Sequence, residues 1–146
     1  MTKINENEKT CRDIADELQA YVDGEMWLCP ECDEAFNGNE SEEGTSYKTI
    51  CPNCDAELNT DELDQASVYD YLSDVYDIEY RIDGNMEYRN VSLMVAGGGP
   101  NIYIDTGSGK VELYWWSDRA SWGISKEVCD QIDYNMEEMY NCRKCS

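Results

Sequence analysis

Two cysteine pairs constrain the fold of this chain most strongly: Cys29-Pro-Glu-Cys32 and Cys51-Pro-Asn-Cys54. They are separated by 18 residues, which is within the spacing typical of a four-cysteine zinc ribbon. Each pair supplies two thiolates from one tight turn, and two such turns complete a tetrahedron around a metal ion. Four sulfur ligands leave no open coordination position, so we expect a structural zinc ion. A rubredoxin-type iron site is the alternative, although Asp33 and Asp55 stand where such turns usually carry glycine.

Four further cysteines lie outside these pairs, namely Cys11, Cys129, Cys142 and Cys145. Together they would supply a second zinc site that joins the N-terminal helix, the last helix and the C-terminal tail. The alternative is that Cys11 and Cys129 are small core residues and that the tail pair binds metal only opportunistically. The N-terminal sequence lacks the apolar stretch of a signal peptide, so we expect a cytoplasmic protein whose cysteines bind metal rather than form disulfides.

Apolar periodicity predicts the helices. Ile14, Leu18 and Tyr21 recur at helical spacing and indicate a helix over about 8–22. Further helices are expected over 60–76, with Thr60 as the N-cap, and over 125–141. The expected organisation is an N-terminal helix at 1–25, the zinc ribbon at 26–59 and an acidic α+β domain at 60–146.

The region between the last two predicted helices alternates apolar and polar residues, which is typical of half-buried strands. Four strands are expected, at 78–82, 86–96, 102–104 and 110–116. The predicted fold class is therefore α+β, an antiparallel four-stranded meander with flanking helices plus the four-cysteine ribbon.

The chain is strongly acidic, with 32 Asp and Glu residues against 11 Lys and Arg, a net charge of −21 and no histidine. Proteins that bind DNA or RNA through phosphates carry basic patches, and anionic membranes attract basic segments, so we expect neither partner. No apolar run reaches the roughly 18–20 residues of a membrane helix. Without histidine the commonest general base is missing, and no phosphate-binding loop is present, so we do not expect an enzyme.

Carboxylates recur at helical spacing on two of the predicted helices. Asp70, Asp74 and Asp77 lie at positions i, i+4 and i+7, and the last helix repeats the pattern. Like charges at this spacing destabilise a helix by about a few tenths of a kcal/mol each, so surface helices usually interleave basic residues. The candidate partner-binding residues are Asp70, Asp74, Asp77, Glu79, Asp130, Asp133, Glu137 and Glu138, together with Glu40, Glu42 and Glu43 of the ribbon loop.

Two interpretations of this charge stay open. A solvated acidic surface that confers solubility is the simpler one. The other is mimicry of nucleic acid, because a domain of this size has a diameter of roughly 38 Å, and duplex DNA of that length carries about 22 negative charges. Tyr114-Trp115-Trp116 at a strand end adds the aromatic side chains that commonly anchor protein interfaces.

The stretch from Asp77 to Trp116, in particular its GGPNIYIDT and LYWW segments, together with the acidic helix that follows, resembles small acidic proteins carried by conjugative elements and phages of Gram-positive bacteria. The resemblance covers about the C-terminal half. Several such proteins are anti-CRISPR or anti-restriction proteins, and some imitate DNA. The resemblance implies a protein that acts in the cytoplasm of a bacterial host.

The expected function is therefore inhibition of a DNA-binding nuclease of a bacterial defence system. A CRISPR effector is the preferred target, because its PAM-reading and heteroduplex channels are basic, and a restriction enzyme is the next. The competing hypothesis is a zinc-ribbon adaptor or regulatory protein of a mobile element that acts through protein–protein contacts. Mimicry predicts binding that weakens with salt and competes with DNA, whereas an adaptor with an apolar contact surface predicts neither.

Overall fold

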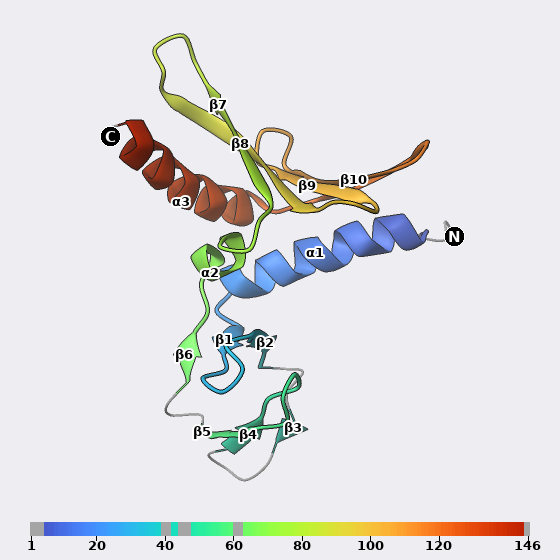
Figure 1. Cartoon of the computed structure of the whole chain (residues 1–146), viewed down its shortest axis with the longest axis vertical. Coiled ribbons are helices and arrows are strands. Elements are labelled where there is room, and N and C mark those ends of the chain that lie inside the picture. Colours follow the sequence, from blue (N-terminus) through green and yellow to red (C-terminus); the bar gives the residue numbers. More distant parts are fainter. Residues whose placement is uncertain (1–4, 39–41, 44–47, 60–62, 145–146) are drawn as a thin grey trace.

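The computed structural model describes residues 5–38, 42–43, 48–59 and 63–144. The protein has two lobes (Figure 1). The larger lobe is an antiparallel sheet with two long helices on one face, and the smaller lobe is the cysteine ribbon at the far end of the first helix. None of the helices in the described part of the chain combines the length and apolar character needed to cross a membrane.

The sheet of the larger lobe has five strands, so the prediction of a four-stranded meander was wrong. The spatial order is β11-β10-β9-β8-β7, and each strand is antiparallel to its neighbours. The missed strand is β11, where only Ala120 and Trp122 supply inward-facing apolar side chains, too few to signal alternation. The strands are β7 (Asp77–Ile82), β8 (Tyr88–Ala96), β9 (Asn101–Asp105), β10 (Lys110–Trp115) and β11 (Asp118–Gly123).

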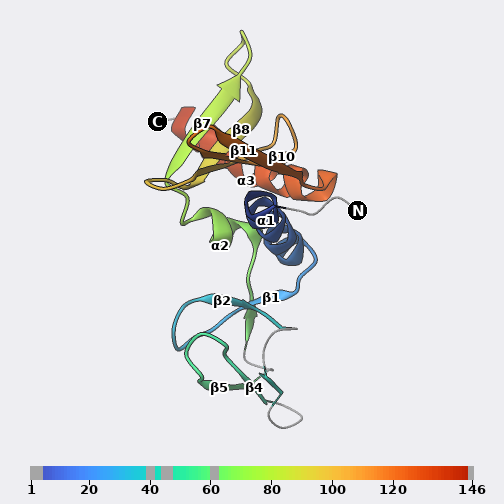
Figure 2. The ribbon, with the colours of Figure 1, turned by 90° about the vertical axis from the view of Figure 1, so that its right-hand side faces the viewer.

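Helices α1 (Glu6–Val22) and α3 (Lys126–Lys144) pack on the same face of this sheet (Figure 2). Both were predicted, and side-chain caps explain where they begin. The Asn5 side chain accepts a hydrogen bond from the Glu8 N–H at 2.8 Å, and the Ser125 hydroxyl accepts one from the Val128 N–H at 3.2 Å. Because α1 and the sheet share one apolar core, helix α1 belongs to the larger lobe. The fully buried members of that core include Cys11, Leu18, Val91, Leu93, Ile104, Val111, Val128, Ile132 and Met136.

The predicted helix at 60–76 is much shorter than expected. Helix α2 spans only Val68–Leu72, and the two-residue strand β6 (Asp64–Gln65) precedes it. The helix begins late because the Asp70 carboxylate accepts hydrogen bonds from the Ser67 N–H at 2.8 Å and the Ser67 hydroxyl at 3.2 Å. Thr60, the predicted N-cap, lies outside the described residues. As a result, Asp74 follows the helix and Asp77 begins β7, so the predicted carboxylate stripe does not lie on one helix face.

The smaller lobe contains two three-stranded sheets with their own apolar cluster. The first sheet has the order β2-β1-β6 and the second β3-β4-β5. Strand β6 pairs with β1 and so belongs to the first of these sheets. The apolar cluster consists of Cys29, Phe36, Cys51 and Leu58, a small core for an independent unit, whereas Met26 of β1 is buried in the core of the larger lobe. The remaining strands are β1 (Met26–Leu28), β2 (Ala35–Asn37), β3 (Glu42–Glu43), β4 (Lys48–Ile50) and β5 (Glu57–Asn59).

Candidate metal centre and acidic waist

The four cysteines of the two predicted pairs come together in the smaller lobe. The Sγ atoms of Cys29, Cys32, Cys51 and Cys54 all lie within 4.8 Å of one another. The Cys29–Cys54 and Cys32–Cys51 Sγ distances are 3.7 Å and 3.8 Å. A tetrahedral ion with metal–sulfur bonds of about 2.3 Å needs sulfur–sulfur edges of about 3.8 Å. The cluster therefore has the size and donor set of a tetrahedral thiolate site.

Both cysteine turns have the same backbone geometry. Each follows the first strand of a hairpin: the Cys29 N–H bonds the Glu34 carbonyl at 3.0 Å, and the Cys51 N–H bonds the Ala56 carbonyl at 3.0 Å. The residue after each second cysteine is left-handed, with φ of 61° at both Asp33 and Asp55. Aspartate tolerates this region better than most residues, which explains how these turns form without glycine.

Backbone amides favour the thiolate form of Cys29, whereas at Cys32 and Cys54 a backbone hydrogen bond is outweighed by burial and the neighbouring sulfurs, which raise the pKa. Burial raises the pKa of Cys29, but hydrogen bonds from the backbone of Cys32 and Glu31 outweigh it and lower this pKa to about 7. The Asn53 N–H likewise donates to the Cys51 sulfur at 3.4 Å. Thiolates are the form that binds metal, so the amides at Cys29 favour ion binding. A four-thiolate tetrahedron suits Zn²⁺ and also iron, and it is closed to substrate.

Among the described residues, Cys11, Cys129 and Cys142 do not come together as the possible second site would require. Cys129 and Cys142 lie on one helix, and thirteen residues at 1.5 Å rise place them about 20 Å apart. One ion cannot bind both sulfurs. Cys11 is fully buried in the core, and burial raises the pKa of the Cys11 and Cys129 thiols, which favours small core residues over metal ligands. Cys145 lies outside the described residues.

An acidic cleft separates the two lobes. It has a volume of about 470 Å³ and lies between α1, the first cysteine turn and α2. None of the described residues that line it is Lys or Arg, and its other walls are mainly tyrosine and aliphatic side chains. The carboxylates that line it are Glu17, Asp33, Glu34, Asp70 and Asp74.

A second hollow continues this acidic lining along α1. It has a volume of about 610 Å³ and lies between α1 and the two cysteine hairpins. Glu17 and Ala35 line both hollows, so the two are adjacent. We call the carboxylates of the two hollows the acidic waist: Asp13, Asp16, Glu17, Asp33, Glu34, Asp70 and Asp74.

The carboxylates of the waist affect the pKa of Tyr21, which lies in the wall of the first cleft. Burial is the main cause that raises the pKa of Tyr21 to about 12, and the carboxylates of Glu17, Asp70, Asp74 and Glu34 raise it further. Each of these groups opposes a second negative charge in the cleft. The same field favours a cation, so the waist is suited to basic groups.

The structure brings together only part of the predicted carboxylate set. Asp70 and Asp74 line the waist, and the Asp70 carboxylate also accepts a hydrogen bond from the Ser67 N–H. Glu40 lies outside the described residues, as do the side chains of Glu42 and Glu43 in β3. The others are distributed over β7 and α3: Asp77 and Glu79 on the strand, and Asp130, Asp133, Glu137 and Glu138 on the helix.

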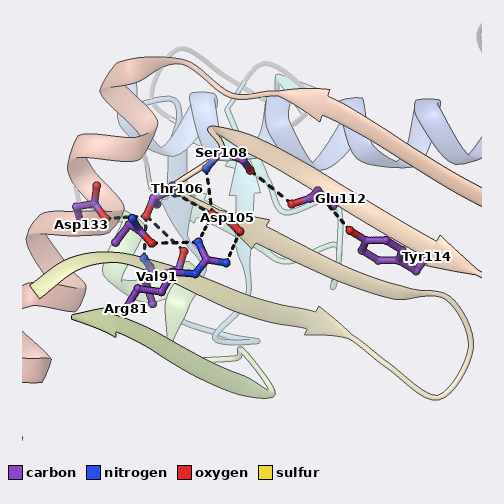
Figure 3. Close-up of polar contacts among 10 residues, drawn as sticks. Arg81, Val91, Asp105, Thr106, Ser108, Glu112, Tyr114 and Asp133 are labelled. Carbon is purple, nitrogen blue, oxygen red and sulfur yellow. Dashed lines mark hydrogen bonds and ion pairs between the residues drawn. The ribbon is translucent and has the colours of Figure 1, made fainter. Parts of the chain in front are cut away.

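Asp133 differs from the other helix carboxylates because its side chain belongs to a polar network on the sheet (Figure 3). Its Oδ1 accepts hydrogen bonds from the Tyr88 hydroxyl at 2.6 Å and the Thr106 hydroxyl at 2.8 Å. Burial first, and then the bond to Asp133, raise the pKa of Tyr88. Asp133 is therefore a structural residue that joins α3 to β8 and the end of β9.

Sequence reasoning missed Asp13, Asp16, Glu17, Asp33 and Glu34 as site residues. The first three lie at helical spacing on α1, on the side that faces the ribbon, and the other two directly follow Cys32. Their spacing was visible, but only the packing of the two lobes shows that they share a surface. The chain matches no protein-family model, no curated protein and no solved structure.

Proposed function

We propose that this protein binds the basic, nucleic-acid-binding surface of another protein, and that the acidic waist is the contact surface. The observation that carries the proposal is the waist itself: seven carboxylates from α1, the first cysteine turn and the α2 region line two adjacent hollows, and no Lys or Arg among the described residues lines either. Arginine and lysine side chains that normally contact phosphates are complementary to such a surface.

The preferred partner is a DNA-binding nuclease of a bacterial defence system. A CRISPR effector is the first candidate and a restriction enzyme the second. Support comes from the net charge of −21, and the choice of a defence nuclease follows the expectation drawn from the sequence of the C-terminal half. In this proposal the protein occupies the DNA groove as an acidic mimic. The metal centre contributes by fixing the position of Asp33 and Glu34 at the edge of the waist, because they are the two residues that follow the ligand Cys32.

The test is a DNA-competition assay with a guide-loaded CRISPR nuclease at two salt concentrations. We expect the protein to displace DNA, and to do so less well at the higher salt, because screening weakens exposed charge pairs. The waist variant Asp33→Asn, Glu34→Gln, Asp74→Asn removes three charges and should lose most of the inhibition. The matched control Asp130→Asn, Glu137→Gln, Glu138→Gln removes three charges from α3 and should keep it.

Equal losses in both triple variants would show that total charge, not the waist, governs inhibition. Absence of DNA displacement at both salt concentrations, for the CRISPR nuclease and then for restriction enzymes, would contradict nuclease inhibition. The adaptor hypothesis would then take its place. It is favoured by the separate ribbon lobe, which has a core of its own.

A further inference from the structure

The turn between β10 and β11 holds a tryptophan at its tip. Trp115 pairs with Asp118 across the hairpin, so Trp116 and Ser117 form a two-residue turn. Trp116 has φ of 56° and is 89% exposed. A bulky side chain in the left-handed region is rare, since Gly or Asn adopts it more easily. The fold thus places an indole in solvent at a position where a smaller residue would serve the turn better.

A second turn brings another part of the chain beside this tip. The β8–β9 turn contains Gly97, Gly98 and Gly99, and it lies at the same end of the sheet (Figure 1). A Cβ on Gly99 would lie 3.6 Å from the Trp115 ring atom Cζ3. The glycine therefore leaves that ring partly uncovered, and Trp115 is 38% exposed. The Trp115 and Trp116 rings are edge-to-face, with centroids 5.9 Å apart at 82°.

Two other rings of the same hairpin already hold guanidinium groups. Arg119 lies over the Tyr114 ring at 5.6 Å from its centroid, and Arg12 of α1 lies over the Trp122 ring at 5.9 Å. Within the described residues, no such cation covers Trp115 or Trp116. Tryptophan is the strongest aromatic partner for a cation, so these two rings have unused capacity for one.

We propose that Trp115 and Trp116, the aromatic tip, form a docking point for an arginine or lysine side chain on a basic partner protein. The choice of partner follows from charge complementarity. A net charge of −21 repels a second copy of the chain and attracts a basic surface. That the partner is basic is taken from the proposed function. The aromatic tip would be a second contact with this partner, besides the acidic waist. Helix α1 runs from the end of the sheet that carries the tip toward the waist (Figure 1), a length of about 25 Å at 1.5 Å per residue.

The test uses a hexa-arginine peptide as the probe and calorimetric titration at low salt. The informative variant is Trp116→Asn, because asparagine suits the left-handed turn and should preserve folding. The matched control is Tyr134→Asn on α3, which removes an aromatic ring that is 62% exposed. We expect Trp116→Asn to weaken peptide binding about two- to fivefold, the size expected for an exposed cation–π contact. Tyr134→Asn should leave the affinity unchanged.

Equal affinities for wild type and Trp116→Asn, or equal losses in both variants, would overturn the aromatic tip as a docking point. So would the absence of measurable binding by the wild type up to millimolar peptide. A chemical-shift change of fluorine-labelled Trp116 on peptide addition gives an independent positive result. Failure of this test can be told apart from failure of the proposed function. The proposed function is tested by DNA displacement with the waist variant, and that variant still carries Trp115 and Trp116.

Discussion

Arg81 on β7 and Asp105 at the end of β9 form a two-pronged ion pair across strand β8. The Nη1–Oδ1 distance is 2.8 Å and the Nη2–Oδ2 distance is 2.7 Å (Figure 3). The Asp105 side chain is 10% exposed and also accepts hydrogen bonds from the N–H groups of Gly107 and Ser108. This carboxylate therefore fixes both the sheet edge and the turn that leads into β10.

The first prediction concerns acid stability. Hydrogen bonding to Arg81 is the main cause that lowers the pKa of Asp105, and the amides of Ser108 and Gly107 contribute. Because the pKa of Asp105 is lower in the folded state, its ionised carboxylate stabilises the fold. This stabilisation is complete above the pKa of aspartate in the unfolded chain, about 3.9, and it is lost as pH falls through the lower, folded-state pKa. Asp105→Asn should reduce the free energy of unfolding by about 1–3 kcal/mol at pH 7. Urea denaturation should show that this deficit shrinks below about pH 4.

Asp118→Asn is the control for this experiment, because Asp118 is exposed on β11 and its variant should follow the wild type at every pH. A deficit for Asp105→Asn that stays constant from pH 7 to pH 3 would contradict the role assigned to the Arg81 pair.

The second prediction concerns metal removal. Cys51→Ser, or a strong chelator, should release the ion and unfold the smaller lobe, since its apolar cluster is small and includes two of the ligands. The larger lobe should stay folded because most of its core comes from the main sheet, α1 and α3, and among the described residues of the ribbon lobe only Met26, Leu28 and Ala35 contact it. With fluorine-labelled tryptophan, the Trp27 resonance should change while those of Trp115, Trp116 and Trp122 persist. Simultaneous loss of all four resonances would show that the two lobes unfold together.

The third prediction concerns metal stoichiometry. One ion per chain is expected, because Cys129 and Cys142 are too far apart to share one. Cys129→Ser and Cys142→Ser should retain the wild-type metal content, whereas Cys29→Ser should lose it. Elemental analysis gives both the amount and the identity of the metal, and so distinguishes zinc from iron. Two ions per wild-type chain would contradict the single site.

The fourth prediction concerns the cysteine turns. Asp55 is left-handed, a conformation that glycine adopts without steric cost, so Asp55→Gly should stabilise the metal-bound ribbon by roughly 1 kcal/mol. The measurement is the chelator concentration at half release, which should rise for Asp55→Gly and fall for Asp55→Ala. The same direction of change in both variants would rule out backbone strain as the cause.

The fifth prediction separates structural from surface carboxylates on α3. Asp133→Leu leaves the hydroxyls of Tyr88 and Thr106 without their acceptor, so it should cost about 2–4 kcal/mol of stability. Asp130→Leu, three residues earlier and exposed, should leave the melting temperature unchanged. Equal stability of the two variants would show that the Asp133 network is not formed in solution.

These carboxylates also show what sequence reasoning can and cannot predict. The metal cluster was predictable because its ligands come from two short motifs whose internal spacing fixes the turn. Helices α1 and α3 were predictable from periodicity. The waist was not, because Glu17, Asp33 and Asp74 meet only through packing between distant segments. Nor does the sequence separate Asp133 from Asp130, since the difference lies in tertiary partners on β8 and β9.

The pairing of β1 with β6 has one more consequence. The chain leaves for the ribbon at Leu28 and returns at Asp64, and these residues face each other in neighbouring antiparallel strands. Opposed residues in such strands are about 5 Å apart, a gap that a two-residue hairpin turn bridges. The cysteine turns and the second small sheet are therefore an insertion between two neighbouring residues of the β1–β6 pair. A change in the length of this insertion is therefore expected to leave the register of the main sheet unchanged.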